Sequence, residues 1–240
     1  MSERKKYPTT DEKNLQGKIR TNFDSPQPTP SQLARKAKSI VAIKELGLPF
    51  TDYLPVVEEE TTIQPRSAEE IAERALALAI VAVKGEANDQ QLVDSLIARF
   101  SAKQLFTPAE LAFITNHSPT KQQLIDFAWQ YECLHVLLWS LGYIEKLKPP
   151  NQICDVPAEV SIIRDLGRQN LSLNAHPRPL SEILDQADYY YRLHWAAIEL
   201  RLNGKSSDKA NEEIIRERHK ALNWLIRYMD QNWDDITTDT

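Results

Sequence analysis

The chain has 240 residues, of which 42% are hydrophobic and 26% charged, so it carries enough apolar material for one substantial core. Six glycines and no alternating β-branched runs argue against a sheet. The net charge of −5 gives no support for a general nucleic-acid or anionic-membrane binder, which usually presents a basic face.

Residues 1–28 are polar, rich in lysine and interrupted by proline, and they predict a disordered N-terminal arm. They contain no apolar signal core. The longest apolar run, residues 75–83, is far shorter than the roughly 20 residues that span a bilayer. Cys133 and Cys154 stand in no metal-binding spacing and suggest a reducing compartment. We therefore expect a soluble, cytoplasmic protein without a membrane span, a metal or a cofactor.

Helix-capping sequences and apolar residues at intervals of three and four predict helices along the rest of the chain. The fifth predicted helix has a wide apolar stripe and should lie at the centre of the core. The predicted helices cover residues 30–46, 67–85, 88–100, a short segment opening at residue 107, and residues 120–141, 157–166, 181–203 and 211–230.

Several of these boundaries depend on single residues. Gly85 and Gly142 are expected to end the second and fifth helices, and Ser181 to cap the seventh. Residues 167–179 are expected to form a loop. The short turn at 204–208 makes the last two long helices antiparallel neighbours. The sequence thus predicts an all-α protein, with a single domain of about seven or eight helices over residues 29–240.

Four separated motifs resemble a known bacterial family, the domain of unknown function 4272. The resemblance covers roughly residues 30–240 and implies no reaction, so it assigns no catalytic residues. His135 stands where that family is expected to have an apolar or aromatic residue, which argues against a family-wide role for it. The motifs are W-Q-Y-E-C-L-H-V-L-L-W-S-L-G at 129–142, E-I-L-D-Q-A-D-Y-Y-Y-R-L-H-W at 182–195, E-R-H-K-A-L-N-W-L at 217–225, and the W-D-D that begins at 233.

Two histidines, His194 and His219, lie on the apolar stripes of the last two long helices. Each is about ten residues from the turn between those helices, so the two rings should lie at similar heights and could face each other. They are either a metal- or substrate-binding pair or two core histidines with structural hydrogen bonds. A metal site usually needs three or four ligands, and the spacing does not supply them. The structural interpretation is therefore favoured.

Charged residues surround these histidines. Asp188 and Arg192 are four residues apart on one helical face, which suits an ion pair, and Glu199 and Arg218 add to the cluster. The arginines could form a fork for a carboxylate or phosphate. A mixed-sign cluster more often neutralises itself, so an interhelical ion-pair network is favoured.

Two further patterns have residues that suit a binding site. Glu132 and His135 have the Glu-x-x-His spacing of di-iron bundles, but such sites need a second pair, which this chain lacks. The tail at 233–240 carries Trp233 and several aspartates, and it is expected to dock on the bundle. Its acids could bind a cation, arginines or helix N-termini, and the tail could also close over a cleft between the last two helices.

The leading hypothesis is a cytoplasmic binding or interaction protein with an unknown protein partner, in which the Trp/His/Arg region is mainly structural. The alternative is a small-molecule binder or enzyme with a pocket between the last two long helices. There Arg192 and Arg218 would hold a small anionic ligand, and His194 or His219 would act as acid or base. No catalytic residue is assigned, and the oligomeric state stays open. The candidate binding residues are Asp188, Arg192, His194, Glu199, Arg218, His219, Trp224 and Asp235.

Overall fold

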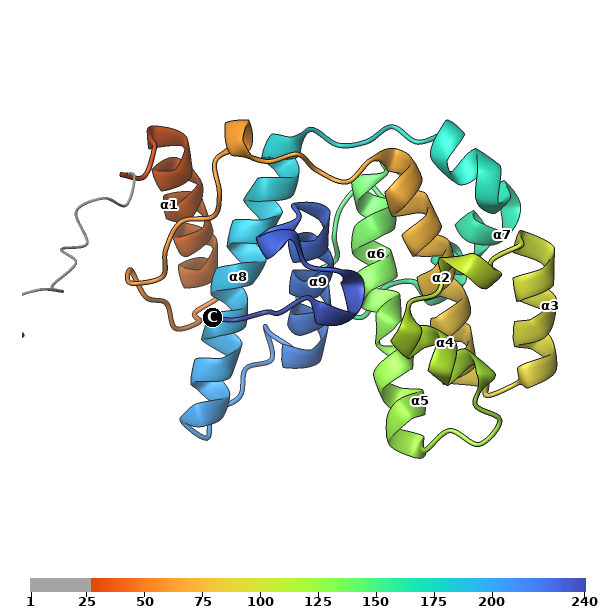
Figure 1. Cartoon of the computed structure of the whole chain (residues 1–240). Helices are drawn as coiled ribbons and strands as arrows, with labels where there is room; N and C mark the ends of the chain where they lie inside the picture. The colour runs from red at the N-terminus through yellow and green to blue at the C-terminus, as the bar shows by residue number, and fades with distance from the viewer. Residues whose placement is uncertain (1–26) are drawn as a thin grey trace, which may run out of the picture.

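A computed structural model of the protein describes residues 27–240, so the predicted arm over 1–28 lies outside the described residues except for its last two. Within the described part, α-helices and short 3-10 turns are joined by loops, and there is no strand. The all-α prediction is confirmed (Figure 1). The helices are α1 (Pro30–Glu45), α2 (Ala68–Ala87), α3 (Gln90–Phe100), α4 (Pro108–Thr115), α5 (Lys121–Ala128), α6 (Gln130–Ser140), α7 (Val156–Leu173), α8 (Leu180–Leu202) and α9 (Glu212–Leu225), with 3-10 turns η2 (Glu60–Thr62), η3 (Lys103–Leu105), η4 (Tyr228–Asp230) and η5 (Trp233–Asp235).

The predicted helix starts are set by local capping. Thr29, Ser67, Thr107 and Thr120 each accept a hydrogen bond from the backbone N–H three residues later, and the Glu or Gln at that later position accepts one in return. This capping box satisfies backbone N–H groups that a helix start would otherwise leave unpaired. Asp155 caps α7 in the same sense, by accepting from the N–H of Ala158.

The predicted end of α2 at Gly85 is wrong. The helix continues to Ala87 and ends at Asn88, which has a left-handed φ of 47°. Gly85 lies inside the helix because α5 crosses it closely: a Cβ at this position would stand 2.5 Å from the backbone nitrogen of Ala128. The glycine therefore marks a close helix–helix approach and not a helix end.

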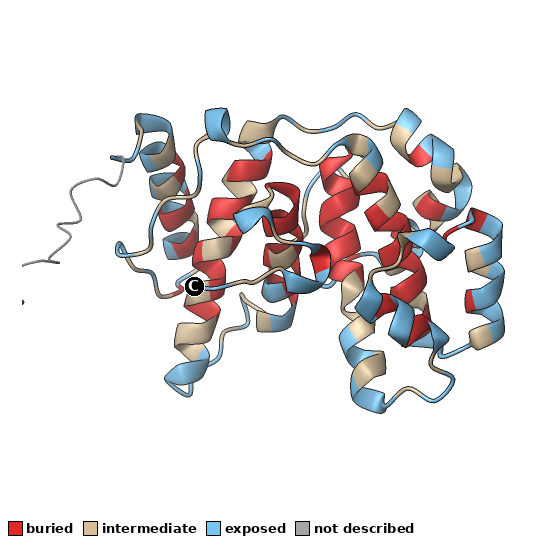
Figure 2. Ribbon diagram, viewed as in Figure 1, coloured by how far each residue is buried: buried red, intermediate tan, exposed pale blue. Residues whose placement is uncertain are grey.

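The helix predicted over 120–141 is divided at Trp129 into α5 and α6, with Gly142 directly after the C-cap Leu141. If the two consecutive segments are counted as one bent helix, the described residues form eight α-helices, in agreement with the prediction. As predicted, α6 is central: every residue from Tyr131 to Ser140 is buried (Figure 2).

Three later boundaries also differ from prediction. Residues 168–173, predicted as loop, continue α7 beyond a break at Gly167, whose φ of 67° and ψ of −179° are not helical. Ser181 lies inside α8, which starts after Pro179 without a side-chain cap. Helix α9 stops at Leu225, since Arg227 adopts a left-handed conformation, and the chain turns into η4 instead of continuing to residue 230.

The helices form a row across the molecule, and their order in this row differs from their order in the chain. Helix α1 lies on α8, α8 on α9, α9 on α6, and α6 on α2, which in turn contacts α5 and α7 (Figure 1). Helices α8 and α9 are close neighbours, as their short connection predicted. No helix in the described part of the chain is both long and apolar enough to cross a bilayer.

Candidate functional site

Arg218 is fully buried, with 0% of its surface exposed, as is Asp188 of the same predicted cluster. From α9 its Nε donates to a carboxylate oxygen of Glu132 on α6 at 2.8 Å, and its Nη2 lies 2.8 Å from the same oxygen in the ion pair. Its other donors bond to the hydroxyl of Tyr190 and to the backbone carbonyls of Lys148 and Gln152. Each nitrogen of this guanidinium thus donates to a protein acceptor, and the loop from 148 to 152 is fastened to α9.

The side chains of Glu132 and His135 point to different partners and do not form a common binding site. Glu132 binds Arg218 and accepts from the backbone N–H of Cys154, whereas Nδ1 of His135 lies 2.7 Å from a carboxylate oxygen of Glu159. The N–H of Lys148 donates to Nε2 of His135, so the ring proton is on Nδ1 and faces Glu159.

Burial sets the charge state of this second pair. Desolvation, with the nearby positive charge of Arg218, lowers the pKa of His135 to about 4. Desolvation, with the neighbouring carboxylate of Glu132, raises the pKa of Glu159 to about 8. In the described part of the chain no three His, Cys, Asp or Glu residues lie close enough together to hold a metal ion.

Asp188 and Arg192 form the predicted ion pair. Both residues are buried, and the two contacts from Nε and Nη2 measure 2.9 and 2.8 Å. Arg192 also donates to the carbonyls of Leu54 and Pro55. The pair therefore fastens the connector between α1 and η2 to α8.

His194 and His219 face each other, as their distance from the turn predicted. Their Nδ1 atoms are 3.1 Å apart, and both rings are buried. Desolvation lowers the pKa of His194 to about 4 and that of His219 to about 3. Both rings are therefore neutral at pH 7, and the contact is a hydrogen bond in which one ring donates and the other accepts.

The remaining predicted residues lie apart from the ion pairs and the histidine pair described above. Glu199 accepts from the amide of Asn203 near the end of α8. Trp224 packs edge-on against Trp233 with ring centroids 5.5 Å apart. Asp235 is exposed on η5.

The tail is docked, with Trp233 4% exposed. The neighbouring Asp234 bonds to the start of α4, accepting from the hydroxyl of Thr107 at 2.6 Å and from the N–H of Ala109 at 3.1 Å. This corresponds to the predicted possibility that tail acids bind a helix N-terminus.

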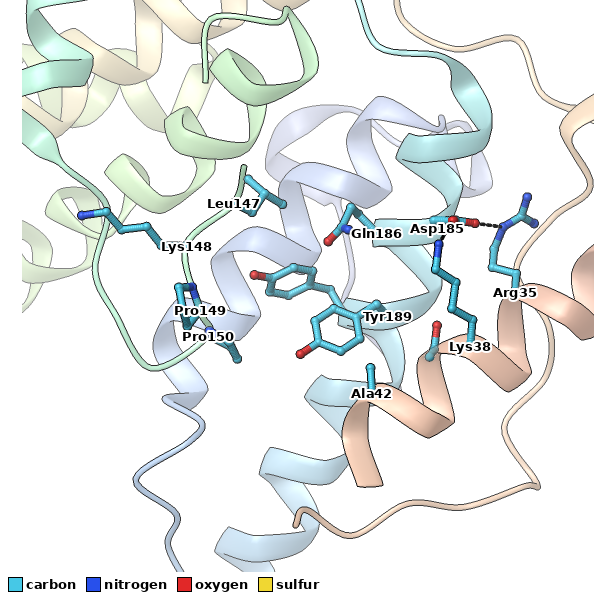
Figure 3. Close-up of a pocket in the computed structure, with 12 residues that line it drawn as sticks. Arg35, Lys38, Ala42, Leu147, Lys148, Pro149, Pro150, Asp185, Gln186 and Tyr189 are labelled. Carbon is cyan, nitrogen blue, oxygen red and sulfur yellow. Dashed lines mark hydrogen bonds and ion pairs between the residues drawn. The ribbon is translucent and has the colours of Figure 1, made fainter. Parts of the chain in front are cut away.

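A pocket that the sequence did not single out lies between α1, α8 and the loop at 147–150, and is called the α1–α8 pocket below (Figure 3). Its volume is about 340 Å³. Its only hint in the sequence is the Tyr189–Tyr191 run, which lies in a motif but carries no binding signature. The lining residues are Arg35, Lys38, Ser39, Ala42, Leu147, Lys148, Pro149, Pro150, Asp185, Gln186, Tyr189 and Tyr190.

The α1–α8 pocket has more cations than anions. Arg35 and Lys38, one turn apart on α1, share the carboxylate of Asp185 at 3.2 and 2.6 Å (Figure 3). Nη1 of Arg35 is buried and has no hydrogen-bond partner in the described part of the chain. On the opposite rim, Lys148 turns its ammonium outward in the same view. Burial raises the pKa of Tyr189 to about 12, so its hydroxyl stays protonated.

Comparison with known proteins identifies a family for the chain but no reaction. The family model for a domain of unknown function, DUF4272, matches residues 35–236, which include every residue that lines the α1–α8 pocket. This confirms the resemblance carried by the four motifs. No curated protein and no solved structure matches the chain.

Proposed function

The chain belongs to the family of the domain of unknown function DUF4272, and from the geometry within the matched segment we propose that it is a binding protein for a small anionic ligand, with the α1–α8 pocket as its site. One observation carries the proposal: Arg35 and Lys38 share a single carboxylate, that of Asp185, on the wall of a ligand-sized cavity. That wall thus carries two cationic side chains beside one carboxylate.

The other walls suit an apolar ligand body. Small-molecule sites are mostly apolar with a few placed polar groups, and their volumes start near roughly 300 Å³. Here Leu147, Pro149 and Pro150 line one side, and the ring of Tyr189 lies across from them (Figure 3). A planar body between these prolines and the tyrosine would place a carboxylate or phosphate at Lys38, whose side chain is 73% exposed. The ligand class is therefore an aromatic or otherwise planar acid.

Two arginines of the cluster predicted from the sequence, Arg192 and Arg218, hold segments that are part of this pocket or next to it. Arg218 binds the hydroxyl of Tyr190, which lines the pocket, and holds the carbonyl of Lys148 in the facing loop. Arg192 is likewise bonded to protein acceptors. In this proposal the two arginines position the site and do not touch the ligand. The sequence-based hypothesis of an unknown protein partner stays a prediction.

The test compares three molecules of one shape: benzoate, phenyl phosphate and the neutral benzamide. Calorimetric titration and amide NMR shifts are expected to show tighter binding of the two anions, with shifts centred on α1, α8 and the loop at 147–150. Lys38→Gln is expected to weaken benzoate binding about two- to fivefold, the effect of one partly exposed charge. Lys44→Gln is the matched control, since Lys44 is an exposed lysine of the same helix that does not line the pocket.

Tyr189→Leu tests the apolar wall separately, and it should weaken benzoate and benzamide alike. The proposal is overturned if benzamide binds as tightly as benzoate, if Lys38→Gln and Lys44→Gln bind equally well, or if the shifts map elsewhere on the molecule.

A further inference from the structure

A groove lies between α3 and α7, over α2, and is called the α3–α7 groove below. Figure 1 shows these helices at the end of the molecule opposite α1. Two cavities occupy the groove, a wide one of about 590 Å³ and a narrow one of about 120 Å³. They adjoin, because Arg99, Phe100 and Arg164 line both of them. Neither cavity shares a lining residue with the α1–α8 pocket.

The narrow cavity is apolar. Ala79 of α2, Phe100 of α3 and Ile163 of α7 line it from three helices, and all three are buried. Apart from Arg99 and Arg164, every residue that lines this cavity is apolar. Its volume is slightly smaller than that of the engineered cavity of about 150 Å³ that holds benzene. An alkyl chain of about five carbons therefore fits it.

The wide cavity presents three guanidinium groups, two of which bridge α3 and α7. Arg99 donates to the carbonyl of Arg164 at 3.2 Å, and Arg168 donates to the carbonyl of Ser101 at 2.9 Å. Both carbonyls lie at a helix end, because Ser101 is the C-cap of α3 and Arg164 is in the last turn before the break at Gly167. Carbonyls at such ends lack intrahelical partners, so the arginines satisfy them and are held beside the narrow cavity.

The carboxylates at this cavity are fewer than the arginines. Arg164 pairs with Asp165 at 2.7 Å, and Arg168 pairs with Glu73 at 2.5 Å. Arg99 is exposed and has no carboxylate within 4.0 Å in the part of the chain that the structure describes. Among those residues, its Nε and Nη1 also donate to no protein group. An anion can therefore bind Arg99 without displacing an existing ion pair.

We propose that the α3–α7 groove binds a short alkyl phosphate, with the phosphate at Arg99 and Arg164 and the alkyl chain in the narrow cavity. These two arginines line both cavities, so they lie where the charged head of such a ligand meets its chain. Guanidinium groups match phosphate oxygens with pairs of N–H donors. A phosphate has three terminal oxygens, and the wide cavity also offers the third guanidinium, that of Arg168.

The experiment titrates the full chain with pentyl phosphate, methyl phosphate and 1-pentanol, and it follows amide NMR shifts. Pentyl phosphate is expected to bind at least about tenfold more tightly than methyl phosphate, because its longer chain is buried in the narrow cavity. It should also bind more tightly than 1-pentanol, which lacks the charge. The shifts should lie in α2, α3 and α7 and should persist with benzoate present in excess. Equal binding of the two phosphates, equal binding of pentyl phosphate and 1-pentanol, or shifts centred on α1 and α8 would overturn the inference.

Two exposed cations give a matched pair of variants. Arg99→Gln is expected to weaken the binding of both phosphates about two- to fivefold, the effect of one exposed charge. Lys103→Gln should leave it unchanged, since this exposed lysine just after α3 lines neither cavity. Equal affinities of these two variants would contradict the proposal.

Val160→Phe tests the narrow cavity separately. Val160 lines that cavity alone, and the larger ring would fill it. The affinity for pentyl phosphate should fall to that for methyl phosphate, while the affinity for methyl phosphate stays the same. An undiminished preference for pentyl phosphate in the folded variant would overturn the inference. Lys38→Gln should not change the binding of pentyl phosphate, so this result and that for benzoate in the α1–α8 pocket are independent.

Discussion

Acidification is expected to destabilise the fold through the histidine pair. His194 and His219 are neutral and buried in the folded protein, with pKa values of about 4 and about 3 that desolvation holds below the unfolded value. An unfolded histidine titrates near pH 6.5, so at lower pH the unfolded chain binds more protons than the folded one. The stability from the neutral pair is therefore complete above about pH 6.5 and is lost as the pH falls toward 4 and 3.

The magnitude follows from these pKa values. At pH 5 an unfolded histidine is almost fully protonated while each folded ring is still neutral, which costs about 2 kcal/mol per ring relative to pH 7. The two rings together lower the free energy of unfolding by about 4 kcal/mol, a large part of the roughly 5–15 kcal/mol by which most domains are stable. His135 adds to this loss, and the raised pKa of Glu159 opposes it.

Urea unfolding at pH 7 and pH 5, followed by circular dichroism, measures the effect. In His194→Gln the first ring no longer titrates, so the difference between the two pH values should shrink by about 2 kcal/mol. His135 and Glu159 act alike in both proteins and cancel in the comparison. His117→Gln, at an exposed histidine, is the control and should keep the wild-type pH dependence. An unchanged pH dependence in His194→Gln would refute the account of a buried, neutral pair.

Three substitutions test the packing. Arg218→Met should lower the free energy of unfolding by about 3–5 kcal/mol, because it leaves the buried carboxylate of Glu132 without its counter-ion; urea unfolding should detect this, and a loss below 1 kcal/mol on that scale would contradict it. Gly85→Ala places a Cβ 2.5 Å from the backbone nitrogen of Ala128, so α5 must move away from α2. This should lower the free energy of unfolding by about 1–3 kcal/mol, with NMR shifts confined to those helices. Asp234→Ala should lower the free energy of unfolding by about 1 kcal/mol and speed amide exchange at the start of α4. Unchanged exchange there would exclude a capping role for Asp234.

Local signals in the sequence are sufficient for the four helix starts with a capping box and for the histidine pair. A capping box such as Ser67 with Glu70 involves four consecutive residues, so its structure follows from the sequence. The facing of His194 and His219 follows from the rise per residue and a short turn, which are also local quantities.

Other errors occur where distant segments meet. The role of Gly85 depends on α5, some forty residues later in the chain, and a helix-ending glycine has the same local pattern as one that admits a neighbouring backbone. The α1–α8 pocket joins Arg35 to Asp185 across 150 residues, and no periodicity reports such a pairing. The sequence marks Arg218 as a candidate binding residue, but the spacing of its partner Glu132 suggests only a metal site. Composition and spacing favour a polar network over a binding site without indicating which residues compose it.

The attachment of the loop at 148–152 to Arg218 also bears on how the protein folds and opens. Two of its backbone carbonyls are held by a side chain from a helix some seventy residues later, so the loop cannot order before α9 docks. Although this segment lies at the surface, the N–H of Lys148, which donates to Nε2 of His135, should exchange with solvent only when the core opens. A ligand in the α1–α8 pocket would then slow the opening of α9 without contacting that helix.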